Sequence, residues 1–98
     1  MITKTAEFEA LKGKRDKVIE AIEIFARAVH VSEPGSRLYV SLQDKDNPDK
    51  FLHVMAFENE GAELMHQKAG YTQEFVQIVS KNCKKDPVFK TYKYVGGL

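Results

Sequence analysis

The sequence predicts an α+β domain whose elements follow the order strand, helix, strand, strand, helix, strand. Residues 2–11 and 37–43 alternate between apolar and polar side chains, as half-buried strands do. Residues 14–30 and 60–82 carry apolar residues at spacings of three and four, as amphipathic helices do. With an apolar run at 51–58, this order is typical of the ferredoxin-like βαββαβ fold, an antiparallel sheet with helices on one face.

The first half of the chain is expected to hold a strand, a helix and a second strand. The strand at 2–11 has Lys4 as the one charged residue on its apolar side. The helix that begins at residue 14 should end near His30, because the Pro34-Gly35 turn cannot continue it. The polar side of the strand at 37–43 can face solvent or a partner subunit, and it consists of Arg37, Tyr39, Ser41 and Gln43.

The middle of the chain predicts a hairpin and, through it, a homodimer. A polar turn at 44–50 separates the strand at 37–43 from the strand at 51–58, as in an antiparallel hairpin. The strand at 51–58 is apolar on both sides, which indicates burial on both faces. Helices cover only one face of such a sheet, so we expect a second copy of the chain to cover the open sheet face.

The last third is expected to hold a broken helix and a final strand. Asn59 is a good N-cap for a helix over 60–69, and Gly70 should end that helix as a left-handed terminator. A second helical piece follows over 72–82. The strand at 88–95 then completes the sheet.

Composition indicates one globular domain over residues 1–98, with 43% hydrophobic and 30% charged residues. The formal net charge of +1 argues against binding to nucleic acids or to an anionic membrane. No apolar run reaches the roughly 20 residues of a membrane span. A start without an apolar signal stretch and a single cysteine, Cys83, favour a cytoplasmic protein without disulfides.

No cofactor or metal signature is visible in the sequence. The spacings between His30, His53 and His66 match no compact metal-ligand motif. There is no glycine-rich phosphate loop, no nucleophile elbow and no Cys-x-x-Cys pair. We therefore expect neither a cofactor nor a metal, which agrees with a cofactor-free reaction and equally with no reaction.

Two histidines stand in apolar surroundings and are candidates for chemistry. His53 interrupts the most apolar strand, so it is either a hydrogen-bonded core or interface residue or a base or substrate anchor in a pocket. His66 shares a helical face with Ala62, Met65 and Ala69, and such a stripe is either core or the wall of a site. Tyr71, at the break between the helical pieces, either donates a hydrogen bond to a ligand or anchors the core.

Several segments occur in a recognisable order: the acid-Pro-Gly turn at 33–35, the Asp/Pro-rich hairpin at 44–49, the pair Phe57-Glu58, the pair Met65-His66, and the helix break at 69–72. In this order they resemble the antibiotic biosynthesis monooxygenase family over roughly residues 1–95, with Met65-His66 at the position of an Ala-His element. The resemblance implies a homodimer of ferredoxin-like subunits, a dimeric α+β barrel. It also implies oxygenation of quinols or anthrones without metal or flavin.

The chain departs from the family pattern at two positions. Phe57 stands where the family often has Trp, and Tyr71 stands where a second histidine is usual. The haem-degrading branch of the family, which uses an Asn on its first strand, a Trp and a helical His ligand, resembles this chain least. Residues 2–11 contain no Asn, the chain contains no Trp, and no histidine follows His66. The resemblance, together with the polar residues in apolar surroundings, leads us to expect that His66 and His53 are catalytic. The residues expected to contact the substrate are Tyr71, Phe57, Met65 and Phe75.

The alternative function is a non-catalytic homodimer of the same fold that binds a small molecule or serves a structural role. This alternative would be favoured if the side chains of Phe57, Met65 and Phe75 filled the cavity that a substrate needs.

Overall fold

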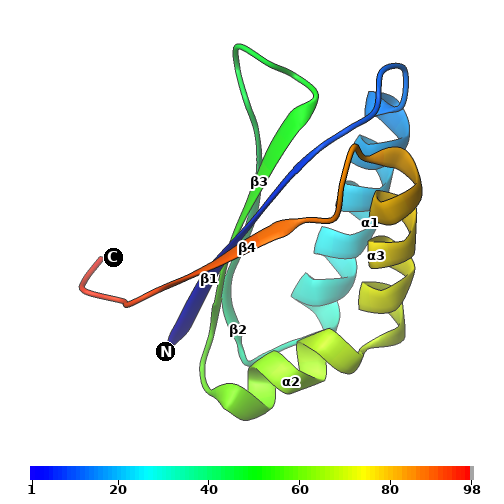
Figure 1. Cartoon of the computed structure of the whole chain (residues 1–98). Helices are drawn as coiled ribbons and strands as arrows, with labels where there is room; N and C mark the ends of the chain where they lie inside the picture. The colour runs from blue at the N-terminus through cyan, green and yellow to red at the C-terminus, as the bar shows by residue number, and fades with distance from the viewer. Residues whose placement is uncertain (98) are drawn as a thin grey trace.

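The computed structural model describes residues 1–97 and confirms the predicted ferredoxin-like α+β fold. The elements are β1 (Ile2–Glu9), α1 (Arg15–Ser32), β2 (Ser36–Gln43), β3 (Lys50–Phe57), α2 (Glu60–Lys68), α3 (Gly70–Asn82) and β4 (Val88–Tyr92). The strands form one antiparallel sheet in the order β2-β3-β1-β4 (Figure 1). No described helix is long and apolar enough to cross a membrane.

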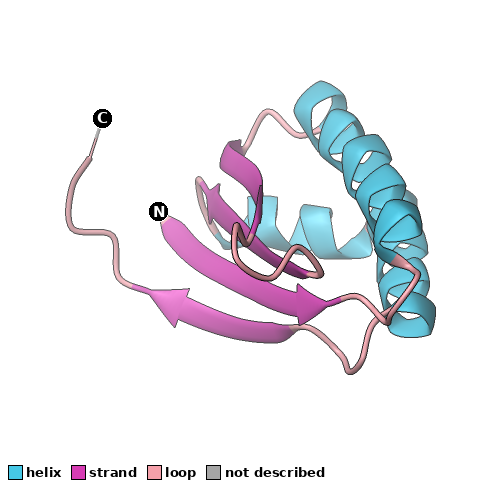
Figure 2. Ribbon diagram, turned by 90° about the horizontal axis from the view of Figure 1, so that it is seen from above, coloured by secondary structure: helices cyan, strands magenta, loops and turns pink. Residues whose placement is uncertain are grey.

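The helices lie on one face of the sheet, where they bury the core (Figure 2). Helix α1 presents one apolar stripe to the sheet, as its helical spacing predicts, and its buried residues are Val18, Ala21, Ile22, Phe25 and Val29. Helix α3 packs beside α1 and contributes Phe75 and Val79 to the same core. Cys83, directly after α3, is 5% exposed and joins this core.

The register of the sheet decides which side of β2 faces the helices. Tyr39 lies opposite Met55, and Ser41 lies opposite His53. Residues opposite each other in a sheet point to the same face, and Met55 and His53 are buried. The polar side of β2 therefore faces the helices. Its apolar side faces outward through Leu38, Val40 and Leu42, which are 42%, 37% and 48% exposed.

The break between α2 and α3 differs from the prediction. Gly70 was expected to end a helix in the left-handed conformation, but it begins α3, and Gly13 (φ 82°) is the one residue with positive φ among those described. Ala69 makes the break instead, with an extended backbone at φ −61° and ψ 140°. Its carbonyl accepts from the amides of Thr72 and Gln73, so one extended residue both ends α2 and starts α3.

Candidate functional site

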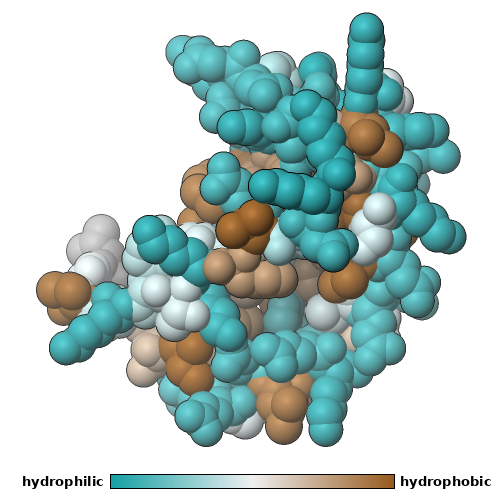
Figure 3. Space-filling model, viewed as in Figure 1, coloured by the Kyte–Doolittle hydropathy of each residue, from teal (hydrophilic) through white to brown (hydrophobic). Residues whose placement is uncertain are grey.

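A cavity of about 400 Å³ lies between the helices and the inner face of the sheet. Its volume falls within the roughly 300–1,000 Å³ of small-molecule sites. Figure 3 shows hydrophobic side chains around a hollow near the middle of one face of the molecule. The apolar part of the wall includes Phe8, Phe25, Met55, Phe57, Phe75 and Phe89.

Polar and charged side chains interrupt this apolar wall, and they are Lys4, Tyr39, His53, Glu63, His66, Gln67 and Thr72. His53 and His66 both line the cavity, from β3 and α2. Lys4, the charged residue on the apolar side of β1, also lines it and pairs with Glu63 of α2. The cavity is therefore apolar in bulk with a few convergent polar groups, as in sites that bind and orient small molecules.

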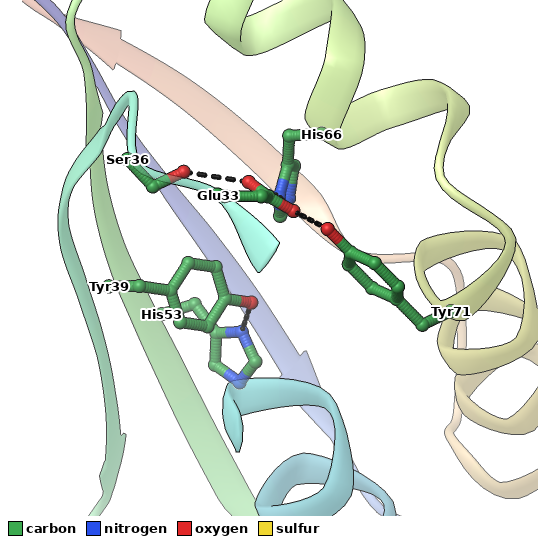
Figure 4. Close-up of polar contacts among 6 residues, drawn as sticks. All are labelled: Glu33, Ser36, Tyr39, His53, His66 and Tyr71. Atoms are coloured by element: carbon green, nitrogen blue, oxygen red, sulfur yellow. Dashed lines mark hydrogen bonds and ion pairs between the residues drawn. The ribbon is translucent and has the colours of Figure 1, made fainter. Parts of the chain in front are cut away.

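His53 is a neutral imidazole in which one ring nitrogen has a hydrogen-bond partner among residues 1–97 and the other has none. It is 1% exposed, and its Nδ1 lies 2.7 Å from the hydroxyl of Tyr39 (Figure 4). Burial, and secondly the proximity of His66, lower the pKa of His53 to about 4, so the ring is uncharged near pH 7. Its Nε2 is buried and has no hydrogen-bond partner among residues 1–97.

The Tyr39 contact decides which nitrogen of His53 carries the proton. Burial, aided by the charge of Glu33, raises the pKa of Tyr39 far above its ordinary value, so the phenol keeps its proton. If Tyr39 donates to Nδ1, the ring proton is on Nε2 and only that N–H lacks a partner. In the other tautomer both the Tyr39 O–H and Nε2 would lack one, which is more costly. We therefore assign an Nε2–H donor to His53.

His66 has the opposite arrangement because its partner is a carboxylate. Its Nδ1 lies 2.9 and 3.1 Å from the two carboxylate oxygens of Glu33 (Figure 4). A carboxylate only accepts hydrogen bonds, so Nδ1 of His66 carries a proton. In the neutral ring Nε2 then holds a lone pair. The two imidazoles therefore differ in tautomer, since the neutral His66 ring has a lone pair on Nε2 and the His53 ring has an N–H there.

Glu33 is brought to His66 by a close approach between two segments. It is the C-cap of α1, and the turn that follows passes so near α2 that a Cβ on Gly35 would lie 2.7 Å from the Cβ of Ala62. Only glycine permits this contact. The turn also carries Ser36, whose hydroxyl donates to Glu33 at 2.7 Å.

The structure brings four of the six predicted site residues together at the cavity. His53, His66, Phe57 and Phe75 all line it. Phe75 stacks on Phe25 with ring centroids 4.3 Å apart, and Phe57 lies 5.0 Å from the His66 ring. These aromatic residues shape the wall without filling the space.

Tyr71 and Met65 lie elsewhere. Tyr71 is not among the lining residues, because its hydroxyl donates to Glu33. Burial, and then the hydrogen bond and charge of Glu33, raise the pKa of Tyr71 to about 12. Met65 is 53% exposed on α2 and also does not line the cavity. The predicted helical face is wrong at this position, since α2 turns His66 inward and Met65 outward.

Two residues of the site were not predicted from the sequence, Glu33 and Tyr39. Tyr39 lies on the polar side of its strand, and the sequence predicts that this side faces solvent or a partner subunit. The structure turns that side toward the helices instead. The position of Glu33 at the C-terminal end of a helix could have indicated its role, because an acidic side chain there is unfavourable unless hydrogen-bond donors surround it. Among residues 1–97, no three His, Cys, Asp or Glu side chains form a group that could hold a metal ion.

Solved structures with the same fold include members described as antibiotic biosynthesis monooxygenases. One such crystal structure superposes with a TM-score of 0.90 at 16% identity, covering 98% of this chain and 100% of the other. A candidate monooxygenase from Deinococcus radiodurans gives 0.87 at 18%, covering 100% and 96%. One from Caulobacter crescentus CB15 gives 0.89 at 17%, covering 97% and 90%. At these identities the likeness shows the fold.

The family itself is shown by the sequence. No curated protein matches the chain. A sequence model described as antibiotic biosynthesis monooxygenase matches residues 1–78, which is most of the chain and includes β1 to α2 with both cavity histidines. The chain therefore belongs to the antibiotic biosynthesis monooxygenase family.

Proposed function

We propose that the protein is a cofactor-independent monooxygenase that acts on a hydroxylated aromatic such as a quinol or an anthrone. The observation that carries this proposal is the pair of histidines in an apolar cavity, one with a lone pair on Nε2 and one with an Nε2–H. Membership of the family supports oxygenation as the reaction class. The apolar wall suits an aromatic ring, and the cavity is large enough to hold one.

The reaction begins with removal of a hydroxyl proton from the substrate. An anthrone in its hydroxy tautomer gives that proton to Nε2 of His66, and the resulting anion is electron-rich. The Nε2–H of His53 donates to the oxygen on which negative charge develops. Phe57 and Phe75 hold the ring and exclude water from the reacting atoms.

Dioxygen is the oxidant, and the substrate supplies all four electrons that reduce its two oxygen atoms. The anion passes one electron to dioxygen, and the organic radical and superoxide then combine to form a C–O bond. His66 returns the proton to the peroxide. The O–O bond breaks as the same carbon loses its hydrogen, so the products are a carbonyl and one water. One oxygen atom enters the product and the other leaves as water.

The test is oxygen uptake with a panel of naphthoquinols and anthrones, corrected for spontaneous oxidation and run with a chelator present. We expect saturable uptake by the wild type, and a fall of about 100-fold or more in kcat for His66→Ala, as for loss of a general base. His30→Ala is the matched control, because His30 lies exposed in the last turn of α1 and outside the cavity. It should leave uptake unchanged.

Uptake no faster than the blank across the panel would contradict the proposal. Saturable binding of the same compounds without uptake would then favour a small-molecule-binding protein of this fold. Equal uptake by His66→Ala and the wild type would remove His66 from the reaction.

We further propose that the protein is a homodimer through the open sheet face. The outward side of β2 is apolar, and exposed apolar surface of this kind is typical of subunit contacts. Val40→Lys should therefore convert a species with the mass of two chains into one with the mass of one, in size-exclusion chromatography with light scattering. Val31→Lys on α1, where the valine is 76% exposed, should leave the mass unchanged. A wild type with the mass of one chain would contradict this proposal.

A further inference from the structure

Glu33 is a buried carboxylate at a position where two effects oppose its negative charge. It is 5% exposed, and removal of a carboxylate from water is costly unless hydrogen bonds replace the lost hydration. It also caps the C-terminal end of α1, where the helix dipole disfavours an anion. A residue kept at such a place needs a compensating role.

Three side chains from three different segments donate to this one carboxylate (Figure 4). Ser36 donates from the start of β2, His66 from α2 and Tyr71 from the first turn of α3. A buried network of this kind is seldom more stabilising than apolar residues of similar volume, because the desolvation cost is large. Stability alone is therefore a poor explanation for it.

We propose that Glu33 is a positioning residue: by accepting the Nδ1–H of His66, it fixes the ring and its tautomer so that Nε2 presents its lone pair to the ligand in the cavity. The inference rests on the proposed function, in which that lone pair accepts the substrate proton. A carboxylate behind a catalytic imidazole selects the tautomer in just this manner in hydrolases.

No other described residue hydrogen-bonds to either ring nitrogen of His66. The tautomer of His66 therefore depends on Glu33 alone among residues 1–97. Ser36 and Tyr71 serve the same end indirectly, since their hydroxyl groups occupy further lone pairs of the carboxylate and hold it in place. Tyr71 thus acts on the site without lining the cavity.

The first test is Glu33→Gln, which keeps the shape of the side chain. A glutamine amide can donate to a bare Nδ1, which moves the His66 proton to Nε2 and removes the lone pair. We expect kcat to fall by about 100-fold or more with KM within about threefold, as when a catalytic imidazole loses its carboxylate. Glu58→Gln is the matched control, because Glu58 is a half-exposed carboxylate that pairs with Arg37 outside the cavity. Its kcat should match the wild type.

The second test reads the tautomer directly and needs no turnover. In ¹⁵N-histidine-labelled wild type, NMR of the neutral His66 ring should show a protonated Nδ1 and a bare Nε2. Glu33→Gln should shift the proton toward Nε2. In the His66→Ala background, adding Glu33→Gln should cause no further loss of kcat, because the carboxylate acts through the imidazole.

The two tests separate this inference from the proposed function. A wild-type ring with its proton on Nε2 overturns the positioning role even if Glu33→Gln fails to fold. An unchanged kcat in a folded Glu33→Gln variant also overturns it. The expected tautomers in a protein that shows no oxygen uptake would support the positioning role while the monooxygenase proposal fails.

Discussion

Acidification from pH 6.5 to pH 4 should lower the free energy of unfolding by about 3 kcal/mol through His53 alone. In the unfolded chain the imidazole takes up a proton near its ordinary pKa of 6.5, whereas burial lowers the pKa in the folded chain to about 4. Between these values the unfolded state binds more protons, so stability falls as the pH falls. The contribution is fully present above pH 6.5 and is lost by about pH 4.

The measurement is denaturant unfolding of the wild type and His53→Gln at a series of pH values and one protein concentration. Glutamine retains hydrogen-bonding groups but does not titrate, so the variant should be less sensitive to acid over this range. Other titrating groups are shared by both proteins and cancel in the difference. His30→Gln, at an exposed position on α1, is the matched control. Parallel pH curves for wild type and His53→Gln would show that folding does not lower the pKa of His53.

Phe25→Ala should reduce the free energy of unfolding by about 3–5 kcal/mol, a large part of the total for a domain of this size. Phe25 is 4% exposed and stands at the centre of the aromatic cluster. Its ring stacks on Phe75 at 4.3 Å and lies 5.4 Å from Tyr39 and 5.6 Å from His66. Truncation would remove these contacts and extend the cavity, and rigid neighbours relax only partly into such a space.

The matched control is Phe89→Ala on β4. Phe89 also lines the cavity but is 62% exposed, so its truncation should change stability by no more than about 1 kcal/mol. Denaturant unfolding at fixed protein concentration compares the two variants. Similar losses for Phe25→Ala and Phe89→Ala would mean that burial does not set the contribution of these rings.

Local sequence patterns predict the order of the helices and strands, but not which side of β2 faces the helices or the residue at which α2 ends. Period-two alternation identifies β2 and separates its two sides, yet it does not say which side faces the helices. That choice depends on pairing with β3, where Tyr39 lies opposite the buried Met55. The break at Ala69 was placed one residue late, because a helix end is set by backbone hydrogen bonds and packing as well as by glycine.

The sequence predicts those site residues that stand out from the apolar pattern around them. His53 and His66 were found because a histidine in an apolar stretch needs a partner or a ligand. Their partners lie far along the chain, with Tyr39 14 residues from His53 and Glu33 33 residues from His66. The first pairing arises when β2 pairs with β3, and the second arises when the turn after α1 meets α2. Neither can be read from composition or from spacing along the chain.

The position of Cys83 has a consequence for a protein that would release quinones. Quinones are electrophiles that add to thiolates, and the thiolate is the reactive form of cysteine. Burial raises the pKa of Cys83 to about 11, and the side chain is 5% exposed in the core behind α3. The only cysteine of the chain is therefore an un-ionised, shielded thiol, which would protect the protein from alkylation by its own product.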